Sequence, residues 1–292
     1  MYERHFGFAV KPFALTPDPA FLYPSRQHAM AMTMLEYFVE SQATFSVLTG
    51  DIGSGKTTLL RHLLRNMGPH VNVGLISNTH QSFKSIHPWA LSALSVVPSD
   101  DSNIALYEAL NDSFVHTYSK GGRTLLILDE AQNLCIEALE ELRLLSNVNS
   151  EKDLVLQILL IGQPELRSKL ADPQLVQFAQ RVSADFHIGP LNRDETAAYI
   201  AHRLKVAGGN TGIFRAESID FIYARTNGVP RLVNQICDMA LLYAFAEKRH
   251  FVDVGLVAQV VNDRGGTVVP AYSHSGTAAA FSHRPRLQVQ DP

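Results

Sequence analysis

The stretch VLTGDIGSGKTTLLRHLL, residues 47–64, places three glycines and a lysine between two apolar runs. It fits the pattern G-x-x-x-x-G-K-[ST] from Gly50 to Thr57, with a strand-like run before it and a helix-like run after it. Glycines let the backbone curl so that successive N–H groups point inward, and the following helix adds the partial positive charge of its N-terminus. The stretch therefore predicts a phosphate-binding loop. Without these flanks it would be interpreted as a glycine-rich turn with a solvated lysine.

The residues expected to bind ATP and Mg²⁺ follow from this pattern. Lys56 is expected to reach the β- and γ-phosphates and to assist catalysis, and the Thr57 hydroxyl is expected to ligate Mg²⁺. The complete set of predicted nucleotide-binding residues in the loop is Gly50, Asp51, Ile52, Gly53, Ser54, Gly55, Lys56, Thr57 and Thr58.

A second motif, TLLILDE at 124–130, ends a run apolar enough to be a strand buried on both faces. Asp129 at its end is predicted to hold Mg²⁺, and Glu130 is predicted to act as the general base that polarises the attacking water. Taken alone, the pair could equally be acidic residues favoured in the first turn of a helix. With the phosphate-binding loop upstream, it predicts hydrolysis of the nucleotide rather than binding alone.

Three further residues are candidates for stabilising the leaving phosphate. Gln163 follows the apolar run QILLIG and would lie at the carboxyl edge of a sheet, although it could be an ordinary turn residue before proline. Arg181 precedes the last strand and is predicted to reach a neighbouring subunit, with a surface ion pair as the alternative. Arg231 begins a helix, where the dipole disfavours a cation unless an external anion is bound. Arg143 is an alternative to Arg181 at a subunit interface.

Apolar runs alternate with helix-period segments from residue 44 to residue 190, which predicts a parallel sheet covered by helices. Strands are expected at 44–50, 70–78, 123–130, 153–162 and 185–191. Helices are expected at 57–68, 104–120 and 135–147. After Pro190 only helices are expected, and the first of them opens with Asn192 and Glu195 at capping-box spacing.

The expected organisation has four parts. Residues 1–43 form an N-terminal arm with the first helix, 44–190 the α/β ATPase core, 191–264 a helical lid, and 265–292 a disordered tail rich in Gly, Ser, Pro and His. The arm carries Pro12, Phe13 and Pro17, which suggest an extended segment anchored by an aromatic ring.

The composition limits the classes of protein that fit. A formal net charge of -3 does not favour global attraction to DNA or anionic lipid. Cys135 and Cys237 are expected to be reduced thiols inside helices, and the single tryptophan, Trp89, is expected to anchor a helix in the core. There is no signal-peptide pattern and no run of the ~18 apolar residues that a spanning helix needs. We therefore expect a cytoplasmic protein without membrane insertion, peripheral at the inner membrane only through partners.

These segments in this order resemble the AAA+ ATPases, and more narrowly the family of general secretion pathway protein A, whose relatives serve pilus assembly and exosortase-linked exopolysaccharide export. The match includes NGVPRLVNQICDMALL (227–242), and its narrower motifs are HFGFAVKPFALTPDP (5–19) and LLIGQPELR (159–167). The resemblance implies a five-stranded αβα ATPase domain with a helical lid and an arm close to the adenine. It also implies a sensor role for Gln163, a finger role for Arg181 and a second sensor role for Arg231.

One departure from the family concerns the end of the chain. Secretion members continue into a transmembrane helix and a peptidoglycan-binding region, whereas this chain ends in a short polar tail, 265–292. The resemblance therefore points to the soluble branch associated with pilus or exopolysaccharide systems.

The expected function is Mg²⁺-dependent ATP hydrolysis by a ring or filament of subunits that supports an envelope-assembly or export partner. The alternative is an ATP-dependent DNA-binding regulator of transposition resembling MuB and TniB, which the net charge does not favour. A third interpretation is a slowly hydrolysing scaffold whose lid is ordered by bound ATP.

Overall fold

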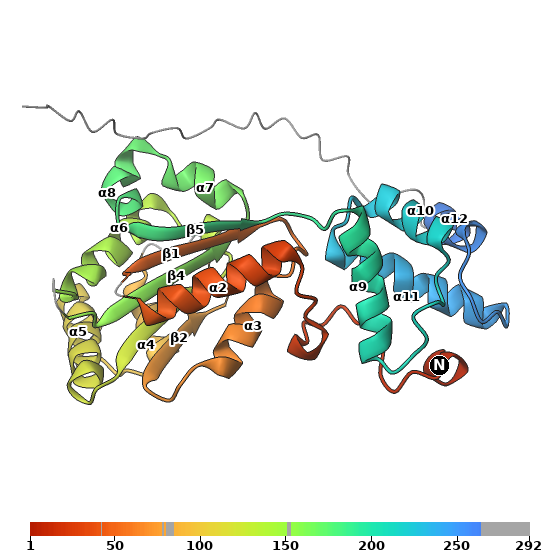
Figure 1. The fold of residues 1–292 in the computed structure, drawn as a ribbon. Helices are drawn as coiled ribbons and strands as arrows, with labels where there is room; N and C mark the ends of the chain where they lie inside the picture. Colours follow the sequence, from red (N-terminus) through yellow and green to blue (C-terminus); the bar gives the residue numbers. More distant parts are fainter. Residues whose placement is uncertain (42, 78, 80–84, 151–152, 264–292) are drawn as a thin grey trace, which may run out of the picture.

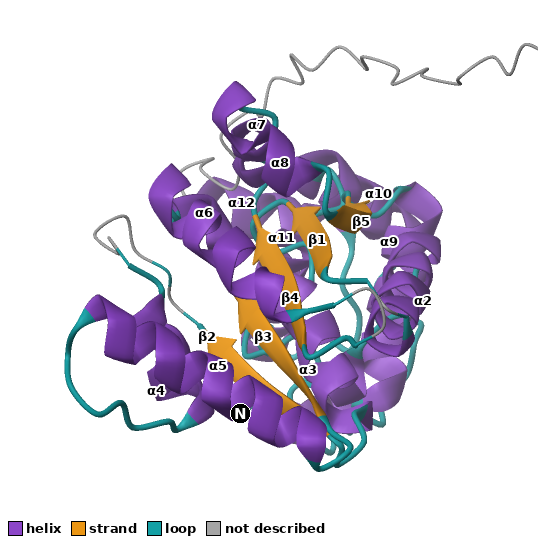
Figure 2. Ribbon diagram, turned by 90° about the vertical axis from the view of Figure 1, so that its left-hand side faces the viewer, coloured by secondary structure: helices purple, strands orange, loops and turns teal. Residues whose placement is uncertain are grey.

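The computed structural model describes residues 1–41, 43–77, 79, 85–150 and 153–263. Its centre is one five-stranded sheet in the order β2-β3-β4-β1-β5, and every adjacent pair is parallel (Figure 2). The strands are β1 Phe45–Gly50, β2 Val71–Ile76, β3 Arg123–Leu128, β4 Leu156–Gly162 and β5 Val182–Ile188. The α/β fold with a five-stranded parallel sheet is therefore confirmed.

Both faces of the sheet are covered, because successive strand side chains point to opposite faces. Leu126 and Leu128 of β3 pack with buried residues from α4 (His87–Leu94), α5 (Asn103–Ser119) and α6 (Ile136–Leu145). Leu125 and Ile127 pack on the other face with α2 (Arg26–Glu40) and α3 (Lys56–Asn66). The apolar runs in the sequence reflect this burial on both sides.

A separate helical bundle follows the sheet and forms the helical lid (Figure 1). Its helices are α9 Arg193–Val206, α10 Ala216–Thr226, α11 Pro230–Ala246 and α12 Val254–Asp263. The predicted capping box is present, since Asn192 Oδ1 accepts from the Glu195 N–H at 2.8 Å and the Glu195 carboxylate accepts from the Asn192 N–H at 3.0 Å.

The N-terminal arm, residues 1–25, packs mainly against the lid (Figure 1). It contains the short helix α1 (Glu3–Phe6) and the 3₁₀ turn η1 (Pro19–Phe21). Phe8, Phe13 and Phe21 are buried in the lid core, and Phe8 lies so close to Gly209 that a Cβ there would be 2.0 Å from its ring. The aromatic anchoring expected of the arm is therefore directed at the lid.

Several expected elements differ in detail from the structure. The last strand begins at Val182, three residues earlier than expected, because it pairs with β1 from Phe45 onward. Cys135 caps the N-terminus of α6 with its sulfur instead of lying inside the helix, and Cys237 is buried as expected. Trp89 is in α4 but is 45% exposed, so its expected core role was wrong.

Other short helices were not expected from the sequence. They are α7 Glu165–Leu170, α8 Val176–Ala179, η2 Ala131–Asn133, η3 Ser146–Val148 and η4 Pro173–Leu175. The predicted tail, 265–292, lies outside the described residues. None of the helices in the described ranges is long and apolar enough to cross a membrane.

Candidate functional site

Strand order brings the two predicted motifs together. β1 lies beside β4, which lies beside β3, so three neighbouring carboxyl ends meet at one edge. The phosphate-binding loop follows Gly50 of β1, Asp129 and Glu130 follow β3, and Gln163 follows β4. This juxtaposition could not be read from the sequence alone, because it depends on β4 being inserted between β1 and β3.

The loop from Gly50 to Gly55 is formed as the motif predicts. Gly53 and Gly55 have φ values of 82° and 102°, in the left-handed region that favours glycine. Gly55 precedes the first residue of α3, and no side chain caps this helix start. The first N–H groups of α3 are therefore left for an external acceptor such as a phosphate.

Lys56 lies folded over the loop. Its Nζ donates to the carbonyl oxygens of Gly50 at 2.5 Å and Asp51 at 3.0 Å, and the residue is 7% exposed. Burial lowers the pKa of Lys56, and the carboxylates of Glu130 and Asp129 act in the opposite direction. A buried cation whose hydrogen bonds, within the described residues, go to carbonyl oxygens is suited to take an anionic ligand.

Ser54 supports the same assignment. Its Oγ is buried and has no hydrogen-bond partner among the described residues. A Cβ on Gly50 would lie 2.7 Å from this oxygen and 2.6 Å from the carbonyl oxygen of Ile188. The crowded glycines and the unpaired hydroxyl fit a loop shaped around an anionic oxygen group.

His28 of α2 lies directly beneath the loop and was missed from the sequence. Its Nε2 is 2.8 Å from the carbonyl oxygen of Ser54, and its Nδ1 is 2.6 Å from Ser25 Oγ. Burial lowers the pKa of His28, which favours the neutral ring. Since a carbonyl can only accept, Nε2 carries the proton and Nδ1 accepts from Ser25. His28 therefore stabilises the loop through the Ser54 carbonyl oxygen. The two residues are far apart in the sequence, and no motif connects them.

The acidic pair adopts a constrained geometry. Asp129 Oδ1 accepts from the Glu130 N–H at 3.0 Å, and Glu130 has a φ of 55°, unusual for a residue with a side chain. Burial raises the pKa of Asp129, and the neighbouring Lys56 acts against this rise. The Thr79 hydroxyl donates to the backbone carbonyls of both acidic residues and so holds this turn in place.

Two glutamines hold the Glu130 carboxylate. Gln132 Nε2 donates to Glu130 Oε2 at 2.6 Å, and Gln163 Nε2 donates to the same oxygen at 3.2 Å. Gln132 Oε1 in turn accepts from the Gln163 backbone N–H at 2.9 Å. Gln132 was missed because its role depends on the η2 turn, which points it back to a residue two positions upstream.

A cavity opens between this edge of the sheet, the N-terminal arm and the helical lid. The predicted residues that line it are Ile52, Gly53, Ser54, Gly55, Lys56, Thr57, Thr58, Glu130, Gln163 and Arg231. The other lining residues are Leu15, Pro17, Phe21, Leu22, Tyr23, His28, Leu191, Tyr199, Pro230 and Asn234. Gly50, Asp51 and Asp129 lie beside it through their interactions with Lys56.

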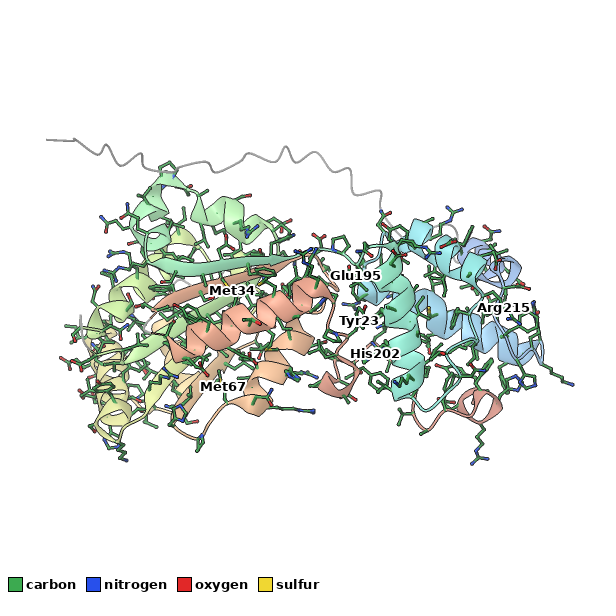
Figure 3. The ribbon with its side chains drawn as sticks, viewed as in Figure 1. Tyr23, Met34, Met67, Glu195, His202 and Arg215 are labelled. Carbon is green, nitrogen blue, oxygen red and sulfur yellow. The ribbon has the colours of Figure 1, made fainter. Side chains whose placement is uncertain are left out.

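The junction at which the arm, α2 and α9 meet borders this cavity (Figure 3). Tyr23 and His202 lie with ring centroids 5.7 Å apart. The Glu195 carboxylate accepts from the Arg26 N–H at 3.3 Å, so the capping residue of α9 also contacts the start of α2. The lid is thus connected to the α/β domain close to the predicted nucleotide site.

Arg181 does not line this cavity. Its Nη1 donates to Ser146 Oγ at 2.6 Å, to Asn147 Oδ1 at 2.9 Å and to the carbonyl oxygen of Arg143 at 3.2 Å. Arg143 itself forms an ion pair with Glu140 at 2.7 Å. Arg181 and Arg143, the two candidates for reaching a neighbouring subunit, therefore lie close together at the end of α6. Within the described residues no cluster of three metal-ligating side chains occurs.

Comparison with known proteins agrees with this fold and site. Residues 39–170 match the family described as "AAA domain", so the chain contains a domain of this class of P-loop protein. The chain is 35% identical to general secretion pathway protein A of Aeromonas hydrophila over 266 residues. The matched region covers 90% of this chain and 49% of that protein. The predicted resemblance is confirmed, and the chain is an AAA protein related to general secretion pathway protein A. It spans about half the length of this curated relative.

Solved structures share the fold at low sequence identity. The Aeropyrum pernix ORC2 protein in its ADPNP–ADP complexes has a TM-score of 0.61 at 17% identity, covering 87% of this chain and 71% of that chain. Drosophila ORC bound to DNA has a TM-score of 0.62 at 17% identity, covering 90% and 65%. At such identities the likeness concerns the fold alone.

Proposed function

We propose that this protein is a Mg²⁺-dependent ATPase whose site lies in the cavity between the sheet edge, the N-terminal arm and the helical lid. The observation that carries the proposal is the meeting of the buried Lys56 ammonium, after β1, with the Asp129 and Glu130 carboxylates, after β3, at the same edge of the sheet. A cation, a helix start that no side chain caps and a pair of carboxylates together suit a nucleoside triphosphate and its metal ion.

Each residue has a defined role in this proposal. The loop N–H groups and Lys56 hold the phosphates, while Thr57 and Asp129 would hold Mg²⁺. When bound, the metal ion neutralises phosphate charge that the protein residues do not cover. Glu130 accepts a proton from the attacking water. Gln163 contacts the Glu130 carboxylate and orients both this carboxylate and the water.

Arg231 completes the proposed site from the lid. It lines the cavity at the start of α11, and its backbone N–H contacts the loop at Gly53. A guanidinium there would compensate charge at the γ-phosphate only when the lid is docked on the loop. Lid position and hydrolysis would therefore be coupled.

The experiment that tests the ATPase assignment compares two variants by nucleotide titration and phosphate release. Lys56→Ala removes the phosphate contact and should lose most of its ATP affinity. Glu130→Gln keeps the shape but lacks a base, so it should bind ATP normally and hydrolyse it ~100-fold more slowly. Normal ATP binding by Lys56→Ala, or normal turnover by Glu130→Gln, would contradict these roles.

The proposed setting is an oligomer that supports an envelope-assembly or export partner. The relationship to general secretion pathway protein A supports this setting. In a ring or filament, Arg181 would reach the phosphate of the neighbouring subunit from the end of α6. A cytoplasmic location, peripheral at the inner membrane through the partner, belongs to the same proposal.

A DNA-binding function is the second candidate, because one structure of the same fold is that of Drosophila ORC bound to DNA. The net charge of -3 argues against a large electrostatic contribution, although a filament needs few cations per subunit. Fluorescence anisotropy with duplex DNA, with and without ATP and over a salt series, tests it. ATP-dependent, salt-sensitive binding would favour this second candidate.

A further inference from the structure

Three polar side chains form a buried chain that ends at the cavity. Arg203 of α9 donates from Nη1 to the Tyr199 hydroxyl at 2.9 Å, and Tyr199 lies 2.8 Å from Asn234 Oδ1 of α11. Arg203 and Asn234 are 7% and 6% exposed. Tyr199 and Asn234 both line the cavity, whereas Arg203 lies behind them. Asn234 lies within the motif at 227–242, but the sequence assigned no role to any of the three residues.

The direction of each hydrogen bond follows from the chemistry of the groups. A guanidinium can only donate, so the Tyr199 oxygen accepts from Arg203. Burial raises the pKa of Tyr199, so its hydroxyl keeps its proton and needs an acceptor. Within the described residues the acceptor of that proton is Asn234 Oδ1. The amide of Asn234 is therefore oriented, and its Nδ2 is the group left to donate into the cavity.

Arg203 is itself fixed by the N-terminal arm. Its Nε donates to the Pro12 carbonyl oxygen at 2.6 Å and its Nη2 to the Ala14 carbonyl oxygen at 3.4 Å. Its guanidinium carbon lies 4.7 Å from the centroid of the Phe21 ring. No carboxylate of the described residues forms an ion pair with it. Burying a cation among neutral acceptors is costly, which indicates that it serves more than packing.

The position of Asn234 distinguishes which end of a nucleotide it faces. Arg231, one turn earlier on α11, contacts the phosphate-binding loop through its backbone. Asn234 lies one turn farther along α11 from that contact. The cavity wall contributed by the arm is mainly apolar, with Leu15, Pro17, Phe21 and Leu22 next to the Tyr23 side chain. Apolar side chains suit a flat base better than a triphosphate.

We propose that Asn234 is a specificity-determining residue that donates a hydrogen bond from Nδ2 to an acceptor on the nucleoside end of the bound nucleotide. Tyr199 and Arg203 act as positioning residues that hold its amide in the donating orientation. The arm thereby influences nucleoside recognition through Arg203 as well as through its own apolar side chains. This inference rests on the proposed nucleotide site, but it does not require hydrolysis.

The test uses isothermal titration of the full chain with two probes, ADP and inorganic tripolyphosphate. Asn234→Leu has a similar volume and lacks the donor, so its ADP affinity should fall about tenfold, the size of one lost hydrogen bond to a buried ligand group. Its tripolyphosphate affinity should not change. Tyr199→Phe releases the amide and should show the same selective loss, smaller in size. Tyr243→Phe, on the same helix and bonded to Asp263 outside the cavity, is the matched control.

Each outcome decides the inference. Equal losses of affinity for both probes would place Asn234 at the phosphates and overturn the inference. Unchanged affinity for both probes would overturn it too, because the hydrogen bonds from Arg203 through Tyr199 to Asn234 would then serve packing alone. If Asn234→Leu does not fold, the selective loss in Tyr199→Phe decides alone. A wild-type chain that binds ADP without hydrolysing ATP would refute the ATPase activity and leave this test intact. A wild-type chain that binds neither probe would overturn both proposals.

Discussion

The backbone N–H of Arg231 in the lid donates to the carbonyl oxygen of Gly53 in the predicted phosphate-binding loop at 3.3 Å. The two residues are so close that a Cβ on Gly53 would lie 2.3 Å from the Cβ of Arg231. The start of α11 therefore rests on the loop, and the smallest side chain at position 53 is a condition of that contact.

Gly53→Ala is expected to weaken ATP binding and to separate the lid from the loop. It forces an alanine into a left-handed conformation and against the start of α11. Gly121→Ala is the matched control, since Gly121 has a φ of 78° but open space around its Cβ position. Both variants should lose about 1–2 kcal/mol of stability from the backbone conformation. Only Gly53→Ala should lose nucleotide affinity in a titration, and equal affinity in both variants would contradict the coupling of lid and loop.

Gln132→Leu is expected to lower kcat about tenfold while ATP affinity remains, because Gln132 positions the Glu130 carboxylate through one charge-assisted hydrogen bond. Steady-state phosphate release and a separate ATP titration give the split between turnover and binding. Gln174→Leu, at an exposed glutamine of η4, is the control for the loss of an amide. A parallel loss of affinity in Gln132→Leu would indicate a general disturbance of the site instead.

Asp129→Asn is expected to stabilise the nucleotide-free protein and to abolish Mg²⁺-dependent turnover. Burial raises the pKa of Asp129, so the ionised carboxylate is disfavoured in the folded chain. A raised carboxyl pKa contributes stability at low pH that is lost as the pH rises through the folded pKa. Asparagine removes that loss, which should be worth about 1 kcal/mol at neutral pH.

Thermal unfolding without nucleotide at pH 4 and pH 7.5 measures this effect. The increase in Tm of Asp129→Asn over wild type should be larger at pH 7.5 than at pH 4. A decrease in Tm at pH 7.5 would mean that the charged carboxylate stabilises the ligand-free fold.

Arg181→Ala is expected to bind ATP almost normally as an isolated subunit while hydrolysis collapses, because the guanidinium would act on a neighbour's nucleotide. Mixing Arg181→Ala with Lys56→Ala subunits should recover part of the activity, since each variant keeps the group that the other lacks. No recovery, in mixtures shown separately to assemble, would count against action between subunits.

Asn147→Ala separates this role from a purely structural one. Arg181 bonds to Asn147 and Ser146 at the end of α6, so removing either partner should cost similar stability. Loss of hydrolysis confined to Arg181→Ala would identify the guanidinium as the functional group. Arg143→Ala in the same mixing experiment decides between the two adjacent arginines.

The local chemistry of this protein was determined by the sequence. Apolar runs at β1, β3 and β4 predicted buried parallel strands, because a strand buried on both faces cannot alternate with polar residues. The glycines around Lys56 and the acidic end of β3 are likewise local features, since loop conformation and strand-end position follow from neighbouring residues.

Tertiary structure alone decided which distant residues meet. The strand order placed Gln163 beside Glu130. The η2 turn directed the Gln132 side chain to the same carboxylate, a contact that no sequence pattern indicated. His28 reached the loop across intervening residues, and the buried chain from Arg203 through Tyr199 to Asn234 joined the arm to the cavity. Sequence periodicity reports which face of an element is buried, whereas these contacts depend on how separate elements pack together.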